Sequence, residues 1–186
     1  DVTSVPHAAP LGFGVLDSIN VRFEMDDALV FDHWSPRTHP RLVGIDTPSS
    51  SASDSEELNK NNIFDEIKKG DILVHHPYHS FATSTQAFFE AAAHDKDVLS
   101  IKSTLYRTSS NSPIISSLIK ACDNGKNVAV LVELKARFDE ERNLGFAERL
   151  ETAGCNVAYG VKGVKTHCKA TLVVRREGHK LVKYVH

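Results

Sequence analysis

The sequence predicts an α/β protein in which helices flank both faces of a mixed β-sheet. From about residue 71 onward, short apolar runs alternate with helical stretches, as is typical of β-α-β folds. The run "NVAVLVEL" at 127–134 is nearly continuous in Val and Leu, which indicates a parallel strand covered on both sides. With 186 residues, of which 41% are hydrophobic, the chain is long enough to bury the core of one ordinary domain.

The apolar runs place the strands. We expect strands at 71–76, 97–106, 127–134, 155–160 and 170–176. Too few residues separate Tyr159 from Ala170 for a crossover helix. The strand at 170–176 should therefore pair antiparallel with its predecessor or lie beside an antiparallel neighbour.

Two helices have clear ends in the sequence. One begins with Ser112 as N-cap and Pro113 at its first position, and it ends at Gly125. The other runs from Asp139 to Gly154.

The residues before these elements form two further segments. Residues 1–45 are an N-terminal segment of uncertain role, in which a hairpin at 19–34 is a candidate remnant of a preceding domain. The Ser-rich tract that follows predicts a linker and a short helix over 46–68. Because the chain begins at Asp1 and ends inside an apparent strand, we expect both ends to be cut.

Cysteine usage and hydropathy bear on the compartment. Three cysteines without C-x-x-C spacing indicate neither a disulfide framework nor a structural zinc site, and they favour a reducing compartment. No apolar run approaches the length of a bilayer span. We expect a cytoplasmic protein, with association at a membrane surface left open.

The charges are divided unevenly along the chain. Residues 1–100 contain 7 Lys and Arg against 16 Asp and Glu, whereas residues 101–186 contain 15 against 8. Several of the later cations fall in loops between apolar strands. The second half of the chain is therefore expected to bind an anionic partner.

The predicted topology brings some of these cations together. Arg107 and Arg137 follow parallel strands, at the sheet edge where open α/β folds bind ligands. The start of an antiparallel strand at 170–176 would bring Lys165, His167 and Lys169 to the same edge. Residues two apart in an extended segment point to one face, so His167 and Lys169 can bind one anion.

Several segments carry a resemblance to a known family: "HHPYHSF", "IKSTLYRTSSNSPII", "NVAVLVELKARFDEERN", "LETAGCNVAYGVKGVKTHCKATLVVRREG" and "KYVH". They resemble polyphosphate kinases of the histidine-phosphorylating type. The resemblance is dense from about residue 69 to the end. It implies that 69–186 is the first of that family's two C-terminal catalytic domains, which are similar to the phospholipase D fold. Whether this domain is truncated here is left open.

The resemblance also implies site residues and substrates. His167 of the "KxHxK" segment would accept the terminal phosphate of ATP as a phosphohistidine, beside Lys169 as a second catalytic residue and Lys165 as a phosphate ligand. Arg107 of "YRT" and Arg137 of "ARFDE" would lie near Mg²⁺. Since a guanidinium has no lone pair for a cation, we assign both arginines to phosphate oxygens, with Mg²⁺ bridging the same phosphates.

Other polar groups are weaker candidates. His75, His76 and His79 could form a metal cluster, but we favour structural or site-lining roles because successive strand residues point to opposite faces. His76 and His186, the latter in the "Y-x-H" segment of the resemblance, are candidate site-lining residues.

Three acids and one cysteine complete the candidates. Glu133, Asp139 and Glu140 could hold Mg²⁺, although Asp139 is equally explained as a helix cap. Cys168 could be a reactive thiolate, but we interpret it as a small packing residue.

The preferred function is reversible transfer of the terminal phosphate of ATP to inorganic polyphosphate, with ADP as the other nucleotide. A phospholipase D-like phosphodiesterase is an alternative, but its signature requires an acid where Val174 stands. A non-enzymatic module that binds polyphosphate or nucleic acid is the other, and only the kinase demands a histidine at position 167.

The expected partners follow from the same interpretation. They are polyphosphate, ATP, the remaining domains of a longer parent chain and further copies of the chain, but no specific nucleic acid. Because the family's other domains have no counterpart in these residues, we expect the isolated chain to be inactive.

Overall fold

The computed structural model describes residues 34–45, 62–109, 112–133 and 140–186. The chain divides into two compact units, 1–35 and 36–186, and the description below concerns the second. The hairpin expected at 19–34 lies almost entirely outside the described residues, as does most of the expected linker. No helix in the described ranges is both long and apolar enough to cross a bilayer.

The core of the unit is a five-stranded mixed sheet with the order β3-β2-β1-β4-β5. Strands β1, β2 and β3 are parallel, β4 is antiparallel to β1, and β5 is antiparallel to β4. The strands are β1 Val98–Leu105, β2 Asn127–Val132, β3 Asn156–Tyr159, β4 Thr171–Glu177 and β5 Lys180–Val185. The prediction of a mixed α/β sheet is confirmed.

The antiparallel direction of β4 is also as expected. Of the two arrangements predicted, the strand lies beside antiparallel neighbours, β1 and β5, and does not pair with the preceding β3. In register, Ser103 of β1 faces Thr171 of β4, so the start of β4 lies beside the carboxyl end of β1.

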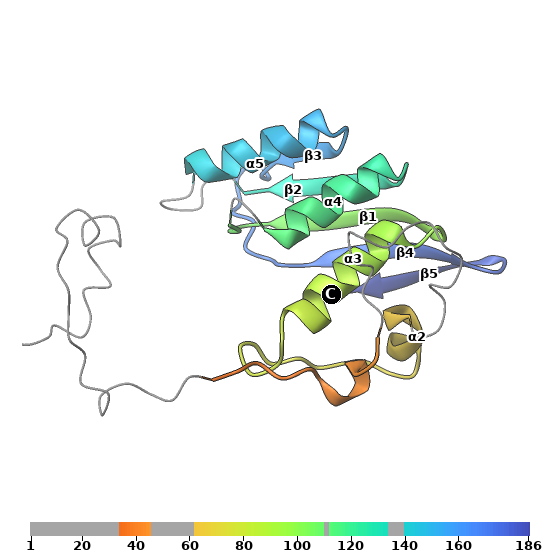
Figure 1. Ribbon diagram of the computed structural model, residues 1–186. Coiled ribbons are helices and arrows are strands. Elements are labelled where there is room, and N and C mark those ends of the chain that lie inside the picture. Colours follow the sequence, from red (N-terminus) through yellow and green to blue (C-terminus); the bar gives the residue numbers. More distant parts are fainter. Residues whose placement is uncertain (1–33, 46–61, 110–111, 134–139) are drawn as a thin grey trace, which may run out of the picture. The chain divides into compact units, whose positions relative to one another are not determined.

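The helical elements form one layer over one face of this sheet (Figure 1). The strand order moves steadily from β1 to β2 to β3, and right-handed crossovers in one direction place α4 and α5 on the same side. The elements are η3 Pro40–Leu42, α2 Ile63–Lys68, the π-helical turn η4 Ala82–Gln86, α3 Ala87–His94, α4 Pro113–Asp123 and α5 Glu140–Thr152.

The single helical layer explains where the core sits. Inward residues of the strands pack with the helices in one apolar cluster, which includes Phe88, Ile101, Leu118, Val130 and Phe146. On the opposite face, where the sequence also led us to expect helices, no described helix covers the sheet. That face carries a hollow of about 440 Å³ lined by side chains such as Lys102, Leu131 and Leu172.

Glycine ends both long helices as the sequence predicts. Gly125 follows α4 with φ of 76°, and Gly154 follows α5 with φ of 86°. Behind each glycine, a backbone N–H reaches back into the last turn, from Lys126 to Ala121 O and from Cys155 to Leu150 O. Glycine adopts this left-handed conformation at no steric cost, which makes such ends visible in sequence.

The strand expected at 71–76 is wrong, because residues 71–75 belong to no strand or helix and a turn begins at His76. Ile72 packs against the core, while Leu73 is 87% exposed. The guanidinium of Arg41 donates to the carbonyl oxygens of Gly70 and Asp71, at 3.0 and 2.9 Å. Backbone acceptors at the start of the segment are therefore satisfied by a side chain rather than by a neighbouring strand.

Candidate active site

The candidate site lies where β1 ends and β4 begins. The hydroxyl of Thr104 joins the two segments, because it donates to Cys168 O at 2.7 Å and accepts from the N–H of Ala170 at 3.0 Å. The N–H of Thr104 donates to Ala170 O at 3.0 Å. These bonds fix the backbone on both sides of residues 168–170, next to His167.

Two buried polar side chains hold the neighbouring loop ends. Glu133, directly after β2, is 4% exposed, and its Oε2 accepts the N–H of Thr166 at 2.7 Å. Asn143 of α5 is fully buried and donates to Tyr106 O at 2.9 Å and to Glu133 O at 2.8 Å. Hydrogen bonds to a carboxylate are stronger than neutral ones, so Glu133 anchors the residue before His167 firmly.

The ring of Tyr106 is the centre of the site. The imidazole of His167 meets it edge to face, with ring centroids 4.8 Å apart. Lys169 Nζ lies 4.4 Å from the ring centroid, Arg107 Cζ 5.5 Å and Lys165 Nζ 5.6 Å. All four distances are within the range of ring–ring or cation–π contact.

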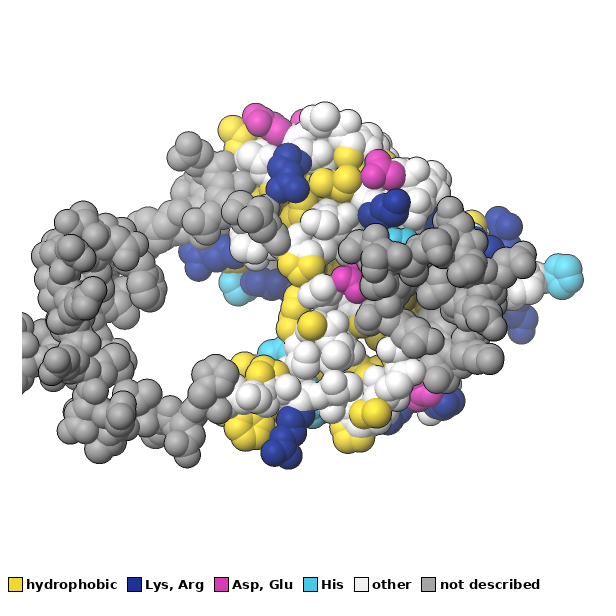
Figure 2. All heavy atoms as spheres, in the orientation of Figure 1, with side chains coloured by type: hydrophobic (Ala, Val, Ile, Leu, Met, Phe, Trp, Pro, Cys, Tyr) yellow, Lys and Arg dark blue, Asp and Glu magenta, His cyan; other side chains and the backbone are white. Residues whose placement is uncertain are grey.

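The structure therefore brings together four of the residues that the sequence singled out. His167, Lys165, Lys169 and Arg107 are all exposed, so an anion can reach them. Arg137 lies outside the described residues, and its position relative to the other four stays a prediction. Figure 2 shows Lys, Arg and His side chains gathered at the end of the sheet where β1 and β2 terminate.

The relation between His167 and Lys169 differs in detail from the expectation. Both residues precede β4 rather than belonging to it. Lys169 Nζ donates to the backbone oxygen of His167 at 2.5 Å, and both side chains contact the aromatic ring of Tyr106. Because they contact the same ring, the two side chains lie on one side of the segment.

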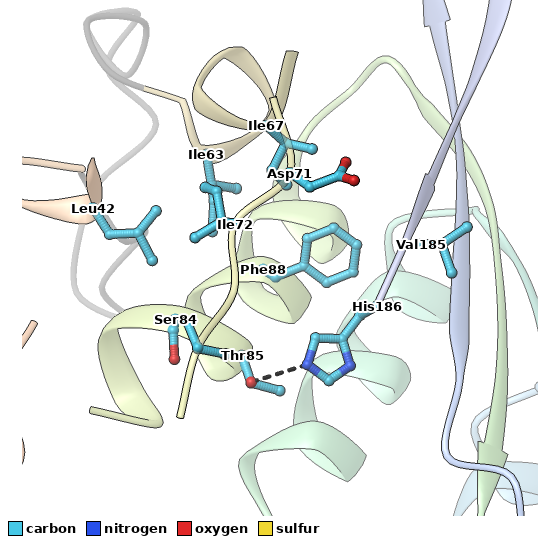
Figure 3. Close-up of a pocket in the computed structure, with 11 residues that line it drawn as sticks. Leu42, Ile63, Ile67, Asp71, Ile72, Ser84, Thr85, Phe88, Val185 and His186 are labelled. Carbon is cyan, nitrogen blue, oxygen red and sulfur yellow. Dashed lines mark hydrogen bonds between the residues drawn. The ribbon is translucent and has the colours of Figure 1, made fainter. Parts of the chain in front are cut away.

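His76 and His186 form a second cluster with Thr85. The Thr85 hydroxyl lies 3.2 Å from His76 Nε2 and 3.1 Å from His186 Nε2. Figure 3 shows the contact between Thr85 and His186 at the rim of a mainly apolar cavity of about 150 Å³, which Phe88 and Val185 also line.

His186 is tied to the sheet edge by its backbone. Its N–H donates to Thr171 O at 2.9 Å and its C=O accepts from Thr171 N at 2.8 Å, so His186, which follows β5, lies beside the first residue of β4. Although the residue as a whole is exposed, its ring packs near Phe88 and Phe89. The loss of water around the ring, and secondarily the nearby His76, lowers the pKa of His186 below its usual value.

The other weak candidates are placed as follows. The N–H of His75 donates to His79 Nδ1 at 3.0 Å, so this ring nitrogen is engaged in a hydrogen bond within the "HHPYH" segment. Cys168 is exposed, which contradicts its interpretation as a packing residue, and its contact with Thr104 is made by its carbonyl oxygen rather than by its thiol. Asp139 and the side chain of Glu140 lie outside the described residues.

A resident metal ion does not fit the side chains described. Within the described ranges, no three His, Cys, Asp or Glu side chains converge as metal ligands. Glu133 is buried and engaged with Thr166, and the guanidinium of Arg107 has no lone pair to offer a cation. The described donors suit phosphate oxygens.

Several of these residues were missed by sequence reasoning. Tyr106 stood in the quoted "YRT" segment, but only its arginine was assigned a role. Thr104, Asn143 and Thr85 act through hydrogen bonds to residues far away in the chain, and no local pattern marks such bonds. An aromatic residue next to an arginine at a strand end was the one signal available.

A mixed sheet that gathers an imidazole and three cations at one edge defines an α/β domain suited to anionic ligands. Residues 62–186 match the family model described as polyphosphate kinase C-terminal domain 1, and the chain belongs to this family. Over the whole chain it is 54% identical to polyphosphate kinase from Mycobacterium leprae, and over 82% of the chain 52% identical to that from Thermosynechococcus vestitus.

A solved structure agrees with the family assignment. The crystal structure of polyphosphate kinase from Porphyromonas gingivalis matches 66% of the chain, with a TM-score of 0.56 and 38% sequence identity, and the match covers 20% of that chain. The present chain spans 23% of the length of the Mycobacterium leprae protein and 22% of that of the Thermosynechococcus vestitus protein.

Proposed function

We propose that this chain is the phosphohistidine-forming domain of a polyphosphate kinase, with residues 69–186 as the catalytic domain. The supporting observation is the placement of His167 with Lys165, Lys169 and Arg107 around one ring. The substrates would be ATP, ADP and inorganic polyphosphate. Family membership and the anion-binding character of the site both favour this function.

The reaction divides into two displacements at phosphorus. In the first, a ring nitrogen of His167 attacks the terminal phosphorus of ATP, a P–N bond forms, and the P–O bond to ADP breaks. In the second, a terminal oxygen of polyphosphate attacks the phosphohistidine, and the P–N bond breaks. The chain gains one phosphate, and the reverse sequence regenerates ATP.

The cations supply electrostatic stabilisation in both steps. The transferring phosphoryl group spreads negative charge over its three equatorial oxygens. Lys165 and Lys169 would act as point charges, whereas the planar fork of Arg107 can bind two oxygens at once. We propose that Arg137 joins them, and that the parent chain's other domains hold the nucleotide base.

Magnesium enters this proposal only with the substrates. Mg²⁺ that bridges phosphate oxygens would neutralise part of their charge. Because the described side chains do not form a metal site, we assign it no protein ligand and no step.

Phosphopeptide mapping tests the proposal. We expect the full-length protein that contains this chain to form an acid-labile, base-stable phosphoryl adduct after brief turnover with labelled ATP, because the nucleophile is an imidazole. The label should map to the peptide with His167 and vanish in His167→Ala. An adduct retained in that variant would contradict the assignment.

His167→Lys separates the kinase from the non-enzymatic alternative. A module that only binds anions would bind polyphosphate about as well with lysine at this position, and the replacement would leave its function intact. The kinase should lose the adduct and all turnover.

A further inference from the structure

We propose that Tyr106 is a positioning residue, whose aromatic ring assembles the nucleophile and the three cations before phosphate arrives. This inference rests on the proposed function of His167. It concerns a different side chain, which would hold three like charges and an imidazole together before phosphate binds.

The nucleophile and the cations of the site converge on one ring. His167 meets it at 4.8 Å between centroids, and the charged groups of Lys169, Arg107 and Lys165 lie 4.4 to 5.6 Å from its centroid. Three like charges so close together repel one another. The negative face of an aromatic ring attracts each of them and so offsets part of that repulsion.

The backbone that carries the ring is fixed by hydrogen bonds. The carbonyl oxygen of Tyr106 accepts from the fully buried Asn143 at 2.9 Å, and the same amide donates to Glu133 O. The ring therefore projects from a backbone that is fixed to both β2 and α5. A platform positions its ligands only if its own backbone is fixed.

Packing in the apolar core does not explain the position of the ring. Tyr106 is only half-buried and is not a member of the apolar cluster under the helices. Tyr184, in contrast, is 4% exposed and belongs to that cluster. The ring of Tyr106 is thus occupied chiefly by the groups of the site.

The ring is also linked to the backbone of the nucleophile. Lys169 Nζ lies over the ring and also donates to the carbonyl oxygen of His167 at 2.5 Å. When a phosphate enters, the cations can exchange the ring for phosphate oxygens with short movements. Prepositioned charges stabilise a developing anion without a reorganisation cost at the moment of reaction.

Two substitutions in the full-length protein test the role of the ring. Tyr106→Phe keeps the aromatic face and should retain the rate of phosphohistidine formation at saturating ATP within about threefold. Tyr106→Leu removes the face and should lower that rate at least tenfold, because misplaced cations stay misplaced in the substrate complex. Tyr78→Leu, at an exposed tyrosine outside the site, is the matched control and should behave like the parent.

A second comparison removes the question of folding. Trifluorinated phenylalanine at position 106 has nearly the shape of phenylalanine but a much weaker negative ring face. We expect a rate at least threefold below that of Tyr106→Phe at an equal melting temperature. A role in packing alone would not distinguish these two side chains.

The outcomes separate this inference from the proposed function. Equal rates for the phenylalanine and fluorinated proteins, or a Tyr106→Phe defect as large as that of Tyr106→Leu, would overturn the role of the ring. An adduct that persists in His167→Ala would instead overturn the proposed function, whatever the Tyr106 variants do.

Discussion

Arg107 shows at the scale of one residue how geometry and charge can be separated. Its guanidinium is planar and presents donors as a fork, whereas lysine carries a compact point charge. The contact with the Tyr106 ring can be kept by either cation. Only the fork can bind two oxygens of one phosphoryl group, so a change to lysine isolates that property.

We therefore expect Arg107→Lys to lower kcat/KM for ATP at least tenfold in the full-length protein, which corresponds to about 1.4 kcal/mol of transition-state stabilisation. Arg137→Lys should have an effect of similar size if that residue joins the site. Arg176→Lys, at an exposed arginine of β4, is the control and should leave the rate unchanged. Parent-like turnover in both site variants would mean that neither arginine binds phosphate as a fork.

Part of the candidate site could be predicted from the sequence alone. The predicted topology brought four site residues to one sheet edge, namely His167, Lys165, Lys169 and Arg107. This was possible because strand direction, unlike side-chain packing, follows from connection lengths. Tyr106 and Asn143 were not predicted, since their roles depend on contacts with residues distant in sequence. A strand-end tyrosine has the same local pattern whether it packs, pairs or supports cations.

At the scale of elements, a half-buried ion network joins β4 and β5 to the helical layer. Arg175 is 15% exposed in its side chain and donates to Asp95 at 2.9 Å and to Glu177 at 3.0 Å. Tyr184 of β5 donates to the same Glu177 carboxylate, and this hydrogen bond, ahead of the Arg175 contact, lowers the pKa of Glu177. The guanidinium also lies 5.6 Å from the centroid of the Phe64 ring in α2.

Removal of the arginine leaves the half-buried carboxylates of Asp95 and Glu177 without the guanidinium that they share. We expect Arg175→Met to reduce the free energy of unfolding by about 3 kcal/mol, measured by urea titration near pH 7. Arg176→Met, one residue further along the same strand and exposed, should change it by less than about 0.5 kcal/mol.

The same measurement at lower pH should show a smaller effect of Arg175→Met on the free energy of unfolding. The folded pKa of Glu177 is lowered, so its contribution to stability is present above the unfolded pKa and is lost as pH falls through the folded value. The stability difference between the parent and Arg175→Met should therefore shrink as Glu177 becomes protonated. A pH-independent difference would mean that packing, not charge, accounts for the loss.

The predictability of the elements followed local chemistry. The ends of α4 and α5 were visible because glycine is needed for left-handed backbone. Strand β2 was visible as a nearly continuous run of Val and Leu, and β1 was visible despite its interspersed polar residues because it precedes a clearly bounded helix. The prediction for 71–76 was wrong because its apolar residues match the pattern of a strand. In the structure, Arg41, about thirty residues earlier, donates to the carbonyl oxygens of Gly70 and Asp71 at the start of the segment. Side-chain hydrogen bonds from such a distance leave no trace in the local pattern.

At the scale of the whole molecule, binding and chemistry should depend on different parts of the protein. The second half of the chain has the excess of cations and contains the candidate nucleophile. The chain spans 22% and 23% of the length of its two curated relatives, so groups that would hold adenine and enclose a polyphosphate chain are expected elsewhere in the parent. Charge alone supplies binding, whereas transfer also requires the donor to be positioned.

We therefore expect residues 1–186 to bind polyphosphate weakly, with an affinity that falls steeply as salt is added, because counterions are released on binding and exposed charges are screened. ATP-dependent chain elongation by the same chain should be undetectable. The measurement is a pair of elongation assays, on this chain and on the full-length protein at equal molar concentration, beside a salt titration of polyphosphate binding. Comparable rates per mole would show that the donor is positioned by these 186 residues alone, and the assignment of nucleotide binding to other domains would be wrong.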